Sequence, residues 1–129
     1  YRAIIGDLDE WCSVQQVQAQ VQAMRVSGAA ATMRVVPGAH HSFDRLTPVE
    51  LISEARVSPG APITFFTDDG APIRACGEGP EPELSERELF LDAAKAGFGR
   101  RGARMGGAAD QPELFRADLL ASFPPVRLR

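Results

Sequence analysis

The spacing of apolar residues near the N-terminus predicts a strand followed by a helix. Ala3 to Ile5 form a short apolar run that ends at Gly6, which is typical of a buried strand. Ser13 and Gln16 then make an S-x-x-Q capping pattern, in which each side chain can bond the free backbone N–H of the other. The helix predicted after Ser13 has one apolar face, formed at three- and four-residue spacing by Val14, Val17, Val21 and Met24.

A second strand completes a predicted βαβ unit. Gly28 suits the end of the helix, where a left-handed backbone conformation is needed. Residues 32–36 (TMRVV) form the next strand, which Pro37-Gly38 closes. Two strands joined by a helix in this way run parallel in one sheet.

The middle of the chain predicts a hairpin. A polar connection is expected near Leu46 to Gly60, followed by a hairpin insertion over about residues 61–76. Its strands are residues 62–67 and 72–75, and Asp68-Asp69-Gly70 is the turn signal between them.

Two helices and a loop are predicted for the last part of the chain. Ser85 begins a helix with Glu88 at the capping-box position, and Gly97 ends it. Residues 99–107 (GRRGARMGG) are too rich in glycine for a regular element, so we expect a loop. Asp110 caps the last helix, which runs to Pro124-Pro125. The fold class is therefore α/β.

The composition of the chain argues against nucleic acid and membranes as partners. The net charge of −3 gives no attraction to nucleic acid or to an anionic membrane, and no apolar run approaches the roughly 18 residues of a membrane span. Cys12 and Cys76 form neither a C-x-x-C pair nor a disulfide ladder, which favours a reducing compartment such as the cytoplasm. A single long-range disulfide is the open alternative.

Two parallel strands and a hairpin are too few for a complete doubly wound sheet. The chain opens on Tyr1, directly before an apolar stretch, so we expect it to begin inside a fold. The remaining strands are then expected upstream or in another chain. A signal peptide would be missing from such a fragment whatever its compartment, so the localisation stays unassigned.

Two loops carry the candidate chemistry, and each follows a strand of the βαβ unit. The first, residues 6–11 (GDLDEW), is rich in carboxylates, and the second, residues 37–44 (PGAHHSFD), holds both histidines. Ligands of open parallel sheets bind beyond the carboxyl ends of the strands, where such loops converge. An aspartate and a histidine at this edge could therefore form the acid–base pair of a catalytic triad.

These loops resemble those of the dienelactone hydrolase family of α/β-hydrolases. That family reads approximately G-x-x-D-D-W after one strand and P-G-A-x-H-x-F-D after the next. The resemblance implies that Asp9 is the triad acid and His41 the triad base, in the chain order that α/β-hydrolases use. Residues 1–129 would then be the C-terminal portion of one α/β-hydrolase domain. The family implies no metal and no organic cofactor.

The nucleophile of that family is absent from this chain. It sits in a G-x-C-x-G or G-x-S-x-G elbow, and no such pentapeptide occurs here. Neither Cys12 nor Cys76 has the strand-to-helix setting that an elbow needs. We therefore expect an ester or lactone hydrolase whose nucleophile, Cys or Ser, lies upstream, so that the chain alone is inactive. The alternative is a non-catalytic structural or interaction domain.

Other interpretations of the site residues stay open at this point. His40 is the rival of His41, because spacing does not separate adjacent histidines. Trp11 and Phe43 are candidate substrate-binding residues, and packing is the alternative for both. A metal site at His40, His41 and Asp44 is disfavoured, because neighbouring side chains point apart. The substrate and the oligomeric state are not predicted.

Overall fold

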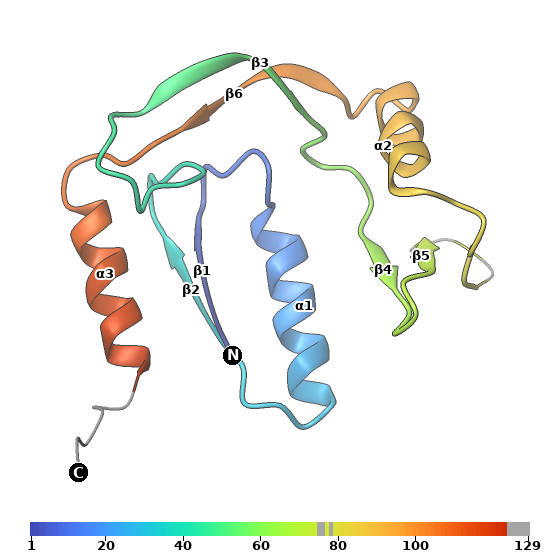
Figure 1. Ribbon diagram of the computed structural model, residues 1–129, viewed down its shortest axis with the longest axis horizontal. Helices are drawn as coiled ribbons and strands as arrows, with labels where there is room; N and C mark the ends of the chain where they lie inside the picture. Colours follow the sequence, from blue (N-terminus) through green and yellow to red (C-terminus); the bar gives the residue numbers. More distant parts are fainter. Residues whose placement is uncertain (75–76, 78, 124–129) are drawn as a thin grey trace.

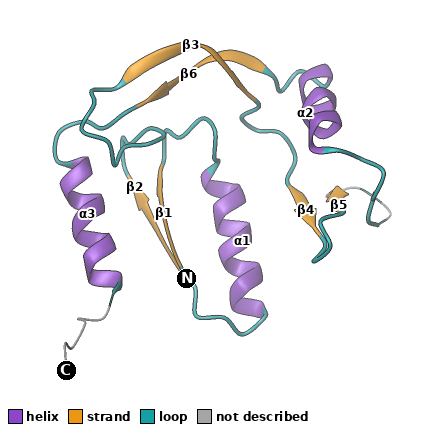
Figure 2. Cartoon of the chain, in the orientation of Figure 1, coloured by secondary structure: helices purple, strands orange, loops and turns teal. Residues whose placement is uncertain are grey.

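The described part of the chain has an α/β fold that combines helices with small two-stranded sheets (Figures 1 and 2). The computed structural model describes residues 1–74, 77 and 79–123. In chain order the elements are β1 (Arg2–Gly6), α1 (Val14–Val26), β2 (Thr32–Val36), β3 (Glu50–Val57), β4 (Thr64–Phe66), β5 (Pro72–Arg74), α2 (Glu86–Lys95), β6 (Arg100–Met105) and α3 (Gln111–Ser122).

The predicted βαβ unit is confirmed. β1 and β2 are parallel neighbours, with Ile4 opposite Arg34, and α1 connects them. The Ser13 hydroxyl accepts a hydrogen bond from the backbone N–H of Gln16 at 3.1 Å, as expected of a helix cap. Among the described contacts only this half of the predicted reciprocal pair forms. Gly28, with a φ of 89°, takes the left-handed conformation expected after α1.

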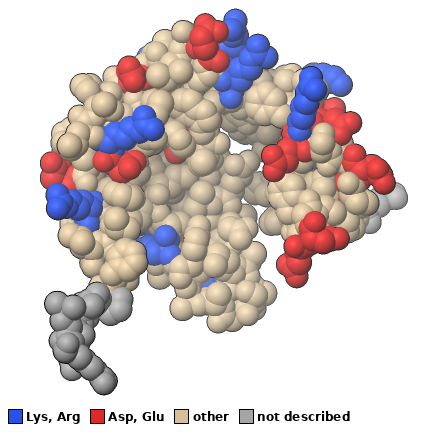
Figure 3. All heavy atoms as spheres, in the orientation of Figure 1, with Lys and Arg blue, Asp and Glu red and all other residues tan. Residues whose placement is uncertain are grey.

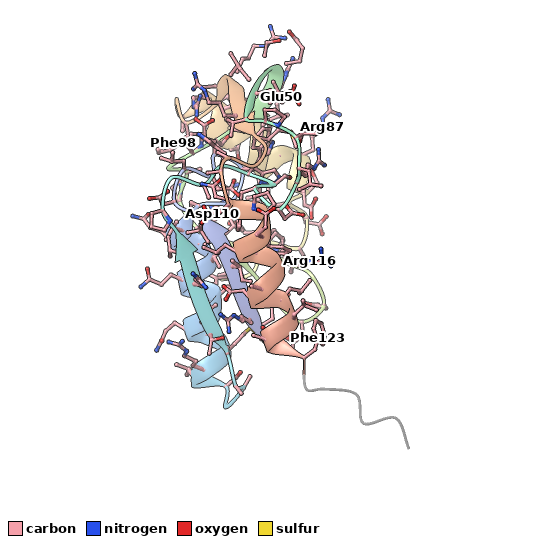
Figure 4. The ribbon with its side chains drawn as sticks, turned by 90° about the vertical axis from the view of Figure 1, so that its left-hand side faces the viewer. Glu50, Arg87, Phe98, Asp110, Arg116 and Phe123 are labelled. Atoms are coloured by element: carbon pink, nitrogen blue, oxygen red, sulfur yellow. The ribbon has the colours of Figure 1, made fainter. Side chains whose placement is uncertain are left out.

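The β1–β2 sheet lies between two helices (Figure 1). Side chains of a strand alternate between its two faces, and the packing follows that alternation. Ala3 packs with Val21 of α1 on one face. Ile4 packs on the other face against the buried cluster of Val36, Ala39 and Phe43, and Leu114 and Phe115 of α3 pack against the same cluster. In the view turned by 90°, α3 runs alongside the strands from Asp110 at its upper end to Phe123 at its lower end (Figure 4).

Two segments expected to be irregular form an antiparallel ribbon instead. The predictions of a polar connection over 46–60 and a loop over 99–107 are therefore wrong within β3 and β6, where Glu50 lies opposite Met105 and Val57 opposite Arg100. Gly102 has a φ of 82°, a backbone conformation that residues with a side chain disfavour. The ribbon therefore needs a glycine at this position. The register shifts between Ile52 and Arg56, as at a β-bulge.

The hairpin and the last two helices are confirmed with adjusted details. β4 and β5 are antiparallel, and their turn closes through the Gly70 N–H, which donates to the Thr67 carbonyl at 2.9 Å. Ser85 and Glu88 form both bonds of the capping box at α2. Asp110 occupies the cap position of α3, but its side chain makes no capping hydrogen bond. The predicted end of the hairpin at Ala75 and Cys76 lies outside the described residues.

Among the described residues, no helix combines the length and the apolar character needed to cross a membrane.

A buried carboxylate fastens α3 to the sheet. Asp118 is only 8% exposed. One of its oxygens accepts a hydrogen bond from Nη1 of Arg34 at 2.7 Å and lies 3.2 Å from Nη2 of Arg2. These arginines extend from β2 and β1, so the single carboxylate joins both strands to the helix.

We predict that Asp118→Ala lowers the free energy of unfolding by about 1–3 kcal/mol, the usual contribution of hydrogen bonds to charged groups. Urea denaturation followed by circular dichroism measures the loss. Glu113→Gln is the matched control, because Glu113 lies exposed in the first turn of the same helix. Equal stability of Asp118→Ala and the control would contradict this role of Asp118.

Candidate functional site

The loops that follow β1 and β2 are bonded to each other at the carboxyl ends of the strands. The Leu8 N–H donates to the Ala39 carbonyl at 3.0 Å, and the Asp7 N–H donates to the Val36 carbonyl at 3.2 Å. The Asp7 carboxylate accepts a further bond from the Gly38 N–H at 2.7 Å. Asp7 therefore shapes the junction of the two loops.

Gly6 allows the two loops to approach this closely. A Cβ atom added at Gly6 would lie 2.1 Å from the Ala39 carbonyl oxygen and 2.5 Å from its carbon. Both atoms belong to backbone, which cannot rotate away as a flexible side chain can. The residue at the end of β1 must therefore lack a side chain.

Asp9 and His41 form the pair that the two loops bring together. Nδ1 of His41 lies 3.0 Å from Oδ2 and 3.2 Å from Oδ1 of Asp9. The expected hydrogen-bond distance between these residues is thus confirmed. The Asp9 side chain is 9% exposed and that of His41 34%, so the carboxylate lies beneath an accessible imidazole.

The carboxylate of Asp9 is held in place by its own loop. Its Oδ1 accepts hydrogen bonds from the backbone N–H groups of Trp11 and Cys12, both at 2.9 Å. These bonds fix the orientation of the carboxylate beside His41. An ionised Asp9 accepts the Nδ1 proton of His41 and leaves the other ring nitrogen, Nε2, as the basic one. The pair can therefore accept a proton at Nε2 and stabilise the imidazolium that results.

His40 occupies a different environment. Its Nδ1 is buried and has no hydrogen-bond partner among the described residues. The partner of Asp9 is His41, so the geometry distinguishes the two adjacent histidines where their spacing did not.

Trp11 and Phe43 have different surroundings. The Trp11 ring lies against the His41 ring, with centroids 4.8 Å apart and a tilt of 38°. Phe43 is 5% exposed and meets Phe115 of α3 edge to face at 5.7 Å. Phe43 therefore anchors residues 37–44, the histidine loop, in the core. Packing accounts for its position better than substrate binding does.

The β3–β6 ribbon supports the histidine loop from above (Figure 1). His41 forms a β-bridge with Met105 at the end of β6, and its carbonyl accepts a bond from the Gly106 N–H at 2.9 Å. Ser42, the next residue, has a φ of 55°, which is uncommon for a residue with a side chain. This support was missed in the sequence because β6 was expected to be a loop.

Two of the three arginines in β6 are held in ion pairs. Arg100 contacts Glu10 of the acid loop, which comprises residues 7–12 after β1, and Arg101 contacts Glu54 of β3. Glu10 also accepts a bond from the Arg104 N–H at 2.7 Å. The ribbon is thereby tied to the acid loop as well as to the histidine loop.

A cleft of about 540 Å³ adjoins the acid loop. Asp9, Trp11 and the start of α1 line one side, and β4 and α2 line the other. The hollow is visible between the central body and the part that carries α2 and the hairpin (Figure 3). Most of its lining is apolar and includes Val57, Ile63, Phe66, Leu89, Phe90 and Phe98.

Cys12 is a third reactive group at the site, beside Asp9 and His41. One ligand atom from each of the three residues lies within 4.8 Å of the others. Desolvation by the surrounding loop, followed by the negative charge of Asp9, raises the pKa of the Cys12 thiol. The sequence signal was the three-residue spacing from Asp9 to Cys12, which fits an aspartate side chain that bonds the backbone ahead of it.

No protein-family model, no curated protein and no solved structure matches this chain. The resemblance of the two loops to dienelactone hydrolases therefore stays a prediction.

We predict that Gly6→Ala separates the two loops and destabilises the protein by about 1–3 kcal/mol, as overpacking does elsewhere. The NMR signal of the hydrogen-bonded Nδ1 proton of His41 should become weaker or disappear. It can be assigned readily, because the chain has only two histidines. Gly77→Ala is the control, because a Cβ atom there meets its neighbours at 3.4 Å or more. An unchanged His41 signal in Gly6→Ala would show that the close approach is not required.

A second prediction concerns the pH dependence of Cys12. In a Cys76→Ser background, alkylation of Cys12 by iodoacetamide should reach half its maximal rate at a higher pH than an unperturbed thiol, because the thiolate is the reacting species. Asp9→Asn should move this midpoint to lower pH by removing the repelling charge. The exposed Asp44→Asn variant should leave the midpoint unchanged. An unchanged midpoint pH in Asp9→Asn would contradict the effect of the Asp9 charge on the pKa of Cys12.

Proposed function

We propose that this chain supplies the acid and the base of an ester or lactone hydrolase, and that its fold is the C-terminal part of an α/β-hydrolase domain. The hydrogen bond between the Asp9 carboxylate and Nδ1 of His41 is the observation that carries the proposal. Its position at the carboxyl ends of two parallel strands is where α/β folds place their active sites.

In the proposed reaction His41 acts at Nε2. It takes the proton of a Cys or Ser nucleophile as that group attacks the substrate carbonyl, and then gives the proton to the leaving oxygen. Asp9 keeps the imidazole in the tautomer with the proton on Nδ1 and stabilises the imidazolium. Water then hydrolyses the acyl intermediate with the same base.

The nucleophile is proposed to come from a segment outside this chain. Cys12 is close to His41, but the raised pKa of its thiol makes the reactive thiolate scarcer at neutral pH. It also sits on the acid loop, three residues after Asp9. Residues 7–13 separate β1 from α1, so Cys12 does not lie on the sharp strand-to-helix turn that an elbow needs.

The apolar cleft beside Trp11 is the proposed binding site for the non-reacting part of the substrate. Its lining of aromatic and aliphatic side chains suits an apolar acyl or alkyl group more than a charged one. Esters and lactones with an apolar substituent are therefore the proposed substrate class.

The rival function is that of a structural or interaction domain without catalysis. The hydrogen bond between Asp9 and His41 would then serve only to join the two loops. The two functions differ in what happens when the pair is changed: a structural pair affects stability, whereas a catalytic pair affects turnover in a protein that stays folded.

We predict that the encoded protein containing this chain hydrolyses an activated ester and that His41→Ala lowers its kcat/KM by roughly 10³-fold or more, as deletions of a triad base do. Asp9→Asn should act in the same direction, because the amide favours the wrong imidazole tautomer. Circular dichroism should show both variants folded.

His40→Ala and Asp44→Asn are the matched controls, since neither residue forms a hydrogen bond with Asp9 among the described residues. Both should retain most of the activity. A protein that is folded but inactive toward esters and lactones would favour the structural function. An equal loss on His40→Ala would remove the assignment to His41, and a complete loss on Cys12→Ser would place the nucleophile on the acid loop.

A further inference from the structure

The acid loop and the histidine loop bring three different metal-binding side chains to one point. A carboxylate oxygen of Asp9, the sulfur of Cys12 and a ring nitrogen of His41 all lie within 4.8 Å of one another. Thiolate, imidazole and carboxylate together are the ligand types that proteins use for Zn²⁺. Aspartates and histidines without a sulfur would be less selective for such an ion.

We propose that Asp9, Cys12 and His41 bind a thiophilic divalent cation of the Zn²⁺ type. The regulatory consequence rests on the proposed hydrolase function: a bound cation occupies the acid–base pair and inhibits the reaction. Binding itself does not depend on that function.

The distances between the side chains suit the proposed cation. Bond lengths of about 2.0–2.3 Å to nitrogen, oxygen and sulfur place the ligands of a tetrahedral zinc ion roughly 3.3–3.8 Å apart. The contact between Asp9 and His41 is already 3.0 Å, slightly shorter than this separation. The Cys12 sulfur lies within the 4.8 Å limit, so small side-chain movements suffice.

The surrounding hydrogen bonds orient the carboxylate for this role. Oδ1 of Asp9 is held by the N–H groups of Trp11 and Cys12. Oδ2 is bonded only to His41 among the described residues. Backbone donors of this kind fix a metal-ligating carboxylate and raise the affinity of metal sites.

Charge and protons balance on binding. Asp9 is ionised, Cys12 loses its thiol proton to solvent, and His41 stays neutral with one ring proton on the nitrogen that does not bind. The two negative charges then neutralise the divalent cation. Binding therefore releases one proton and strengthens as the pH rises. Whichever ring nitrogen binds, Nε2 is no longer a free base, because it either holds the cation or carries the ring proton.

The test uses the 129-residue chain with Cys76→Ser, which leaves Cys12 as the sole thiol. Co²⁺ is added first, because a cobalt–thiolate charge-transfer band and intense visible bands report tetrahedral thiolate coordination. Zn²⁺ is then added to displace the cobalt. Trp11 is the only tryptophan of the chain and touches His41, so its fluorescence gives an independent readout.

We expect both cobalt signals at one equivalent, quenching of Trp11, and loss of the signals on addition of Zn²⁺. Cys12→Ser and His41→Ala should each weaken Zn²⁺ binding by about tenfold or more, since even outer-shell changes have effects of that size. Asp9→Asn keeps the side-chain shape and should also weaken binding. Asp44→Asn should bind Zn²⁺ as the parent chain does.

Absence of the charge-transfer band, or unchanged affinity in Cys12→Ser, would overturn the metal site. The two proposals fail separately. Cobalt and zinc binding in a protein without esterase activity would leave the metal site and remove the hydrolase function. Esterase activity that depends on His41 but is indifferent to Zn²⁺ would do the reverse.

Discussion

The site depends on the contact between the end of β1 and the backbone after β2. Gly6 meets the Ala39 carbonyl at a distance that leaves no room for a side chain. Because the strands are parallel, this contact joins two loops that leave the sheet in the same direction. The hydrogen bonds from Leu8 and Asp7 then fix the spacing between the loops, and with it the separation of Asp9 from His41.

The other elements hold that contact in place from several directions. α1 and α3 cover the two faces of the β1–β2 sheet, and Asp118 ties α3 to both strands. The β3–β6 ribbon holds the histidine loop at Met105. A residue such as Ser42 can remain at a positive φ beside His41 because the packing on both sides fixes it there.

The local parts of this structure were predictable from the sequence, and the long-range parts were not. The βαβ unit follows from apolar spacing and a helix cap, which act over a few neighbouring residues. β3 was missed because most of its residues are exposed on both faces, so no period-2 alternation marks it. β6 contains a glycine and pairs with a segment about 50 residues earlier. Such pairing leaves no mark in either segment alone.

The pair of Asp9 and His41 was predictable because two strand-end loops and a family resemblance both indicated it. The participation of Cys12 was missed, since it results from the turn of the acid loop, and the spacing from Asp9 to Cys12 was its only sequence signal. That turn exists because Oδ1 of Asp9 accepts the N–H groups of Trp11 and Cys12. The bond that shapes the loop is therefore also the bond that brings a thiol to the acid–base pair.

The charge of Asp9 decides which chemistry this cluster favours. Desolvation, followed by the negative charge of Asp9, disfavours a thiolate at Cys12. A compensating positive charge beside Cys12 would favour its thiolate. A proton on His41 brings one such charge and removes the base, whereas a divalent cation brings two and needs both anions. The charge of Asp9 thus contributes to disfavouring Cys12 as a nucleophile, and the same charge would make the cluster a ligand for a thiophilic metal.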